Sequence, residues 1–287
     1  MAATVIHVPR INATPSDFAD LFSIRAEAGG LFTDVQFDFS NCDFLAPNAV
    51  ACLGGIARLV DHNGGQAVFN WGSMSPKVLM NLRQNGFAGK FGDPSGQWDG
   101  NSIPYREDGI RDVQGIMEYL MYRWLGKGWV RVPVQVANAI AGQMWEIYGN
   151  AFEHSNTQIG VFSCGQYFPQ MNELVLTAID FGQGIPQKIR TFLGQDDRAQ
   201  TLSSSSCLQW AFGRGNSTSV GKVARGLGLD LLKEFVASNR GKMEVYSNDG
   251  YAIIDERGDR YSDRNIGFEG TIVYVTLHCD ESLYQGY

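Results

Sequence analysis

In the first third of the chain, segments with the two-residue hydrophobic period of strands alternate with segments that have the longer period of helices. The segment DVQFDF, residues 34–39, alternates polar and apolar positions, and residues 47–62 form an apolar stretch of helical length. Gly and Asn stand at the joints between such segments. The predicted strands are 3–8, 34–39 and 66–71, and the predicted helices are 16–28, 47–62 and 75–85. This alternation predicts a small α/β domain of the βαβα type at residues 1–95.

The periodicity is lost in GKFGDPSGQWDGNSIPYREDG, residues 89–109, which is rich in Gly, Asp, Pro and Ser. Such a composition is typical of a loop, and we expect a linker at residues 96–111. The predicted helices after it are 112–125, 132–154, 198–212 and 227–238, with one more following the glycine-rich turn in 181–193. The predicted strands are 158–167, 173–180, 242–247 and 271–279. We therefore expect a second α/β domain at residues 112–287.

The bulk composition limits the classes of partner. The chain has 287 residues, 44% hydrophobic and 18% charged, which is ordinary for a globular protein with two domains. Its net charge is −7 and no run is rich in Lys and Arg, so a protein that neutralises many nucleic-acid phosphates is excluded. The composition is still compatible with small anionic ligands, because backbone N–H groups bind them whatever the net charge of the protein.

The five cysteines lie far apart and form no C-x-x-C pair. Their odd number and wide spacing favour reduced thiols over a disulfide framework or a zinc site. The segment MAATVIHVPRINATP lacks the features of a signal peptide, and no apolar stretch approaches the length of a membrane span. We expect a cytoplasmic protein that has no membrane partner.

Three polar residues follow one another at steps of four in WEIYGNAFEHS: Glu146, Asn150 and His154. On a helix, this spacing places a carboxylate, an amide and an imidazole in one row. Glu146 can act as a general base, and the carbonyl oxygen of Asn150 suits Mg²⁺, which prefers oxygen ligands. The alternative is the ordinary solvated stripe of an amphipathic helix.

A second cluster is AIDFGQGIP, residues 178–186, in which Asp180 ends an apolar strand and Gly182 and Gly184 follow. Glycines there allow positive φ or a close approach of the backbone to a ligand. A part-buried carboxylate can accept a hydrogen bond from an amino group, worth about 1.5–3 kcal/mol and enough to select one base. The alternative is a common Asp/Gly turn after a strand.

The third cluster is GKVARGLGLDLL, residues 221–232, in which three glycines precede a predicted helix start and Lys222 and Arg225 add positive charge. The free N–H groups and the dipole of a helix start favour phosphate oxygens. A Walker A loop is excluded, since Val223 stands where that motif has Ser or Thr. The alternative is a flexible loop that ends at a helix boundary.

Together and in this order, the three clusters resemble the N, G1 and G2 boxes of the GHKL ATPase superfamily. Gyrase-type topoisomerases, sensor histidine kinases and anti-sigma-factor kinases belong to it. The N box appears as EIYGNAFEH, the G1 box as DFGQGIP and the G2 box as ARGLGLDLL, and the Gly-Thr pair at 270–271 looks like the G3 element. The resemblance covers residues 112–279 and implies the α/β sandwich called the Bergerat fold.

The resemblance also implies that the chain binds ATP with Mg²⁺. The residues that it assigns to ATP binding are Asn150, His154, Asp180, Gly182, Gly184, Lys222, Arg225, Gly226, Leu227, Gly228 and Thr271. Among them, Asn150 would bind the Mg²⁺, Asp180 would accept the adenine amino group, and Thr271 would hydrogen-bond near Asp180. The glycines of the G2 box would wrap the phosphates beneath a lid at 213–225. Glu146 would activate water in a hydrolase or assist the acceptor group in a kinase.

The segment VQFDFSNCDFLAPNAVACLGGIARLV, residues 35–60, is similar to STAS domains, the fold of anti-sigma-factor antagonists. It repeats their order of strand, short loop and helix. Where that family carries its phosphorylatable serine, at the start of the helix, this chain has Ala46, Pro47, Asn48 and Ala49. The likeness implies a STAS-like domain at residues 1–95 that is not regulated by phosphorylation at this point.

None of the four histidines lies on the predicted helix 112–125, so a kinase that phosphorylates its own histidine is not expected. No mechanical output domain is expected after the ATP-binding region. We expect an ATPase or a protein serine/threonine kinase, with Glu146 as base, that acts with a STAS-like or sigma-factor-like regulatory protein; a homodimer is compatible with this. Two alternatives stay open: a non-catalytic switch in which ATP changes the surface shown to a partner, and an interaction protein with a degenerate site.

Overall fold

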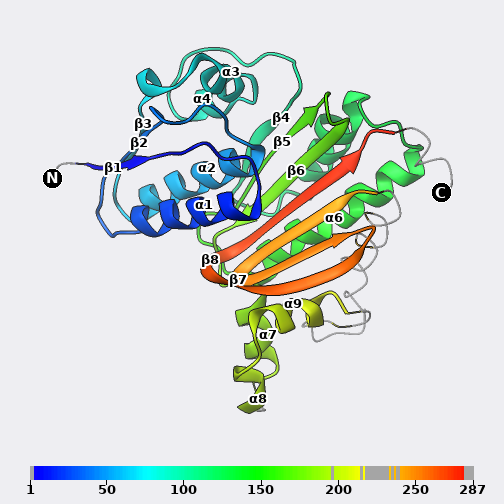
Figure 1. Cartoon of the computed structure of the whole chain (residues 1–287). Coiled ribbons are helices and arrows are strands. Elements are labelled where there is room, and N and C mark those ends of the chain that lie inside the picture. The colour runs from blue at the N-terminus through cyan, green and yellow to red at the C-terminus, as the bar shows by residue number, and fades with distance from the viewer. Residues whose placement is uncertain are drawn as a thin grey trace. The chain divides into compact units, whose positions relative to one another are not determined.

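The computed structural model describes residues 3–194, 197–213, 216, 233, 236 and 240–280, apart from the side chains of His154, Asp197 and Arg198. Over these residues the protein is mixed α/β (Figure 1), which confirms the expected class at that level. The chain divides into two compact units, the first made of 1–107 and 162–166 and the second of 108–161 and 167–287. No helix of the described part is both long and apolar enough to cross a membrane.

The first unit contains a parallel sheet of three short strands in the order β1-β2-β3. The strands are β1 (Thr4–His7), β2 (Val35–Asp38) and β3 (Ala67–Phe69). Ile6, Phe37 and Phe69 share one row of the register and are buried, and the rings of Phe37 and Phe69 lie 5.0 Å apart. Buried and half-buried residues alternate along β2, which confirms the period of two predicted for residues 34–39.

The helices of this unit are α1 (Pro15–Ala28), α2 (Pro47–His62), α3 (Pro76–Gln84) and the short α4 (Phe87–Lys90), with a 3-10 turn, η1, at Trp71–Ser73. The three longer ones confirm the predicted helices. Each begins with a proline, whose fixed φ and missing N–H suit the first helical position. Thr14 and Asp17 form a capping box at α1, and the Ser75 hydroxyl accepts from the Val78 N–H at α3.

The prediction of a linker at 96–111 is wrong in part, because this segment contains a strand, β4 (Ser102–Asp108). Ile103 and Tyr105 are buried within it. A Cβ on Gly54 of α2 would overlap the Tyr105 hydroxyl, so the strand packs tightly on that helix. Glycine, proline and charged residues surround these two apolar positions and leave too short a pattern for the period of two to appear.

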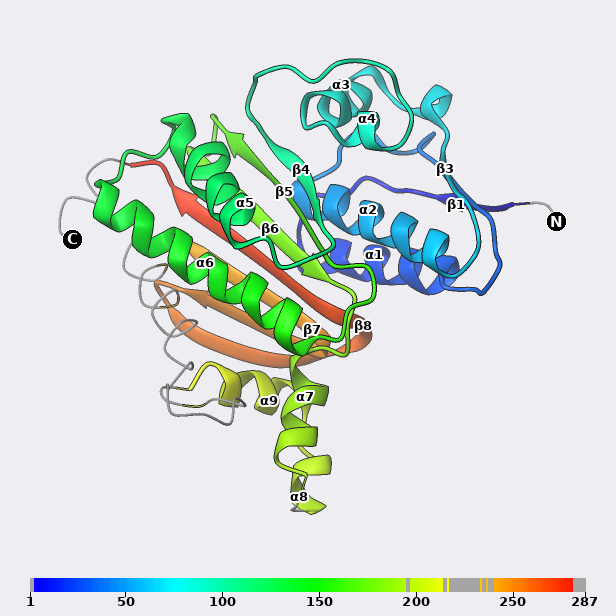
Figure 2. The ribbon, with the colours of Figure 1, turned by 180° about the vertical axis from the view of Figure 1, so that it is seen from behind.

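The second unit starts with α5 (Val113–Glu118), which continues as a π-helix, η2 (Tyr119–Trp124), and a 3-10 turn, η3 (Leu125–Lys127). The elements that follow along the chain are α6 (Val134–His154), β5 (Val161–Phe168), of which residues 162–166 belong to the first unit, β6 (Glu173–Asp180), α7 (Ile185–Phe192), α8 (Asp197–Gln200), α9 (Ser204–Ala211), β7 (Lys242–Asp255) and β8 (Gly258–His278). The five-stranded sheet has the order β4-β5-β6-β8-β7, with β8 antiparallel to β6 and to β7. Figure 2 shows α6 along one face of the strands β6, β7 and β8 of this sheet.

The predicted strand at 173–180 is confirmed by β6, but β7 and β8 are much longer than the strands predicted at 242–247 and 271–279. They continue as a hairpin through residues 248–270, where the register shifts twice near Asn248. This segment is largely polar and its pairing comes from the opposite strand, so its own hydrophobic pattern does not reveal it. The helix predicted at 198–212 is divided into α8 and α9, and the one predicted at 227–238 lies almost wholly outside the described residues.

Candidate functional site

Asp180 is a buried carboxylate at the end of β6. The strand ELVLTAID is apolar up to this residue, and Asp180 keeps only 5% of its surface exposed. In the antiparallel register of β6 and β8 its partner is Thr271, which is also buried. The structure therefore brings together two residues that the sequence assigned to one site from positions far apart in the chain.

Hydrogen bonds and burial act in opposite directions on the Asp180 carboxyl. The Gly182 N–H donates to its Oδ1 at 2.9 Å, and the side chains of Ser155 and Thr271 also favour its charged form. Removal from water disfavours the charged form and outweighs these bonds, so the pKa of Asp180 is raised from 3.8 to about 7. Asp180 can thus exist as a neutral donor or as a charged acceptor close to neutral pH.

The glycine turn after Asp180 is joined to the end of α6. The Gln183 N–H donates to the carbonyl oxygen of Ser155 at 2.7 Å. A Cβ on Gly182 would overlap that same carbonyl oxygen, so a larger residue does not fit there. Gly184, the N-cap residue of α7, has a φ of 79°, a conformation that glycine adopts without strain. Both glycines therefore have a physical reason to occupy their positions.

We expect Gly182→Ala to destabilise the protein by about 1–3 kcal/mol, because the added methyl group must displace backbone at the end of α6. Urea unfolding followed by circular dichroism measures this change. The matched control is Gly142→Ala in α6, where a Cβ meets no atom within 4 Å and alanine favours the helix. Equal stability of the two variants would contradict the close packing at Gly182.

Two residues of β7 complete the turn, and neither was predicted. The Ile185 N–H donates to the Ser247 Oγ at 2.8 Å, and this Oγ lies 2.9 Å from the Oγ1 of Thr271. The Asn248 Nδ2 donates to the Gln183 carbonyl oxygen at 3.2 Å. In sequence, Ser247 is one hydroxyl residue at the end of an apolar run, VYS, so only the pairing of β7 with β8 reveals its place in the site.

Helix α6 carries the predicted polar row away from its apolar face. Ile147 and Tyr148 are buried in the core, whereas Glu146 is half-buried and Asn150 is exposed. His154 is the last residue of the helix, and its side chain lies outside the described part. Glu146 and Asn150 are therefore placed as the helical period predicts.

Ser155, the residue directly after the polar row of α6, makes the contacts that join this helix to Asp180 and its turn. At a rise of about 1.5 Å per residue, Asn150 lies about 7.5 Å and Glu146 about 13.5 Å farther along the helix axis. The structure thus orders these side chains along a line that leads away from Asp180. Ser155 was not predicted as a site residue, although it follows His154 directly in the sequence.

The remaining predicted residues, Lys222, Arg225, Gly226, Leu227 and Gly228, lie outside the described residues, as does most of the expected lid at 213–225. Within the described part, no group of three or more His, Cys, Asp or Glu side chains could hold a metal ion.

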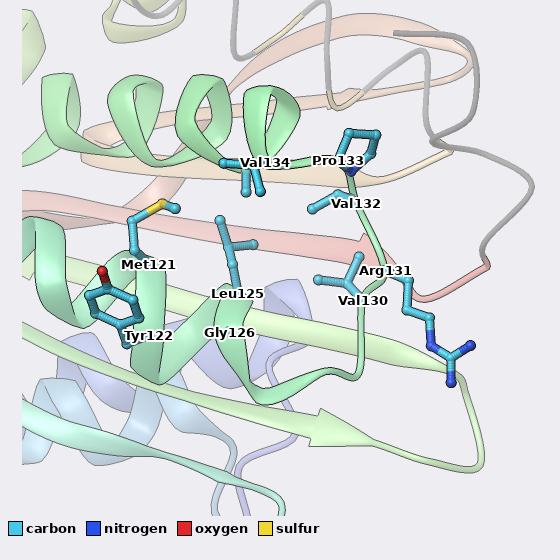
Figure 3. A pocket seen from close by; sticks show the side chains of 10 residues that line it. Met121, Tyr122, Leu125, Gly126, Val130, Arg131, Val132, Pro133 and Val134 are labelled. Atoms are coloured by element: carbon cyan, nitrogen blue, oxygen red, sulfur yellow. The ribbon is translucent and has the colours of Figure 1, made fainter.

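A pocket of about 590 Å³ lies at the N-terminal end of α6, away from Ser155 (Figure 3). Its lining residues are Met121, Tyr122, Leu125, Gly126, Val130, Arg131, Val132, Pro133, Val134 and Ala137. The side chain of Arg131 points away from the others in Figure 3, so the lining is mainly apolar. By the helical rise, Val134 is about 24 Å from Asn150 along α6, which separates this pocket from the Asp180 site.

No protein-family model matches the chain, and no curated protein gives a significant match.

Proposed function

We propose that this chain is a Mg-ATP-binding regulatory protein of the GHKL kind, which hydrolyses ATP or phosphorylates a partner protein on Ser or Thr. The observation that carries the proposal is the buried Asp180 carboxyl, set between Thr271 of β8 and the Gly182 turn. On this proposal residues 112–287 adopt the Bergerat fold and residues 1–95 are STAS-like. The partner is then a STAS-like or sigma-factor-like protein.

The hydrogen bonds of Asp180 favour an amino-bearing base. One carboxylate oxygen accepts from the Gly182 N–H, and the other lone pairs of an ionised carboxylate can only accept. The amino group of adenine is a complementary donor. A base with an oxo group at that position would place an acceptor against an acceptor in a buried site, which carries a desolvation cost. In its ionised form Asp180 therefore discriminates adenine from guanine.

The order of side chains along α6 suits the rest of the nucleotide. A ligand that has its base at Asp180 and extends along the helix meets Asn150 before Glu146. Asn150 is exposed and offers a carbonyl oxygen to a phosphate-bound Mg²⁺. Glu146 can then take the proton from a water or from a hydroxyl of the partner. The oxygen of that water or hydroxyl bonds to the terminal phosphorus as the bond to ADP breaks.

Calorimetric titration of the full chain with Mg-ATP tests the proposal. We expect affinity to rise as the pH increases from 6 to 8 and then to level off, because only the ionised Asp180 accepts from the amino group and its pKa is about 7. Since the phosphates of ATP also titrate, the same series with Asp180→Asn gives the reference. The wild-type rise should exceed that of the variant.

Thermal unfolding gives a second test, because the stability of the ligand-free protein and its affinity for Mg-ATP should change in opposite directions as Asp180 loses its proton. The folded-state pKa of Asp180 lies above its ordinary value of 3.8, so the native state binds this proton more tightly between pH 3.8 and about 7. Its contribution to the stability of the ligand-free protein therefore falls as the pH rises through that window. Mg-ATP should raise the melting temperature more at pH 8 than at pH 6. No rise at either pH would contradict the proposed function.

A further inference from the structure

Gln143 of α6 carries a buried acceptor that no protein group satisfies. The residue is half-buried, and its Oε1 is enclosed by protein and has no hydrogen-bond partner within the described residues. Buried polar atoms are nearly always hydrogen-bonded, because an acceptor that is removed from water without a donor costs free energy. An exception of this kind requires an explanation, and a donor that arrives with a ligand supplies one.

Gln143 belongs to the polar row of α6. It precedes Glu146 by three residues and Asn150 by seven, and these spacings place the three side chains on one face of the helix. Met144 and Ile147, which lie on the neighbouring face, are buried in the core. Side chains three residues apart on a helix have Cβ atoms about 5–6 Å apart. Gln143 and Glu146 can therefore meet the same small group.

Glu146 also lacks a donor. This half-buried carboxylate forms no hydrogen bond and no ion pair with the part of the chain that the structure describes. An ionised carboxylate and an amide oxygen can only accept, so the two residues cannot satisfy each other through these atoms. The last side-chain torsion of glutamine is soft, which lets the Gln143 oxygen turn toward a donor. The pair therefore matches a group that offers two protons.

We propose that Gln143 is a positioning residue that holds the attacking water of ATP hydrolysis. This inference rests on the proposed function and selects one of its two reactions. A water molecule has two protons, so it can donate to Glu146 and to Gln143 at the same time. The hydroxyl of a Ser or Thr has one proton, which goes to the base and leaves the Gln143 oxygen unsatisfied. The two acceptors thus favour water over a protein hydroxyl.

The position of Gln143 along α6 agrees with this role. At about 1.5 Å per residue, it lies about 4.5 Å beyond Glu146, on the side away from Asn150. The nucleophile attacks phosphorus in line with the bond to ADP and from the opposite side. For a nucleotide that extends from Asp180 past Asn150, that side is the Gln143 side.

The atoms of the step balance as follows. The water oxygen bonds to the terminal phosphorus while the bond from that phosphorus to ADP breaks. One water proton passes to Glu146, which later releases it to solvent. The other proton stays on the new inorganic phosphate and keeps its hydrogen bond to Gln143. No further reactant is needed.

Gln143→Met tests the role in turnover, since Met has a similar length but carries no amide oxygen. Release of inorganic phosphate from Mg-ATP by the full chain should fall about tenfold, the equivalent of one neutral hydrogen bond in the transition state. The KM for Mg-ATP should stay within about twofold of the wild-type value, because the lost contact is to water and not to the nucleotide.

The stability of the same variant separates positioning from a structural role. Loss of a residue that supports the fold lowers the melting temperature, whereas removal of an unsatisfied buried acceptor relieves its cost. Gln143→Met should therefore raise the melting temperature of the ligand-free protein by about 2 °C. If this variant does not fold, Gln143→Leu provides the same two measurements.

Glycerol reports on the choice of nucleophile, because each of its hydroxyls has one proton. In its presence, label from γ-labelled ATP divides between inorganic phosphate and glycerol phosphate. Only the reaction with water loses a hydrogen bond in Gln143→Met. The ratio of glycerol phosphate to inorganic phosphate should therefore rise by up to about tenfold in this variant.

The matched control is Gln135→Met, which removes an exposed amide from the first turn of α6. Gln135 lies about 12 Å from Gln143 along the helix axis. Its turnover, product ratio and melting temperature should equal those of the wild type.

Unchanged turnover in a folded Gln143 variant, an unchanged product ratio, or a lower melting temperature would overturn the inference. A wild-type chain that binds Mg-ATP and labels another protein without releasing inorganic phosphate would also overturn it, but would leave the proposed function standing. Absence of Mg-ATP binding would overturn the proposed function and, with it, the role of Gln143.

Discussion

Asp180→Asn should weaken Mg-ATP binding by about 10- to 150-fold, the equivalent of one hydrogen bond to a buried charge. The Gly182 N–H needs an acceptor, so the amide oxygen of the new side chain stays with it. The amide nitrogen then faces the ligand, and a donor meets the amino group of adenine. Calorimetric titration at pH 8, where the wild-type carboxyl is mostly ionised, measures the loss.

The same substitution should also change base preference. A donor at this position suits an oxo group, so the ratio of ATP to GTP affinity should decrease in Asp180→Asn. Asp255→Asn is the matched control, because that carboxylate pairs with Arg260 at the tip of the β7–β8 hairpin. Unaltered ATP affinity in Asp180→Asn, with the fold intact by circular dichroism, would refute the assignment of the base to Asp180.

Glu146→Gln should lower the rate of ATP turnover by about 100- to 10,000-fold, the usual contribution of a general base. The glutamine keeps the size and polarity of the side chain but does not take a proton at neutral pH. Because Glu146 is the row member farthest from Asp180, Mg-ATP affinity should change little. Incubation with γ-labelled ATP, alone and with a lysate of the source cell, follows label into free phosphate, this chain or another protein.

Glu118→Gln controls for loss of a helical carboxylate in the same unit, since Glu118 is exposed at the end of α5 and accepts from Gln114. Its turnover should equal that of the wild type. Turnover that persists in Glu146→Gln would remove this residue as base. If wild-type turnover is absent while Mg-ATP binds, the protein is better described as an ATP-dependent switch.

Several elements could be predicted because their signals are local. The apolar run of β6 ends at a single acidic residue, and this pattern alone placed Asp180 at a strand end. The step of four in α6 likewise kept Glu146 and Asn150 off the buried face. By contrast, β4 and the outer part of the β7–β8 hairpin are short in apolar residues, and partner strands stabilise them. The hydrophobic pattern of such strands is therefore too weak to predict them from their own sequence.

The sequence by itself determined the strand that ends at Asp180, the polar row of α6 and the glycines that the following turn requires. Each depends on the period of a single element or on one residue's conformational freedom. The family resemblance already implied that Thr271 lies near Asp180. Only the tertiary structure decided that the two are partners in the strand register, that Ser155 joins α6 to the turn, and that Ser247 of β7 reaches both Thr271 and α7. The physical reason is that burial and hydrogen-bond partners arise from strand register and helix packing, which bring together residues distant in the chain.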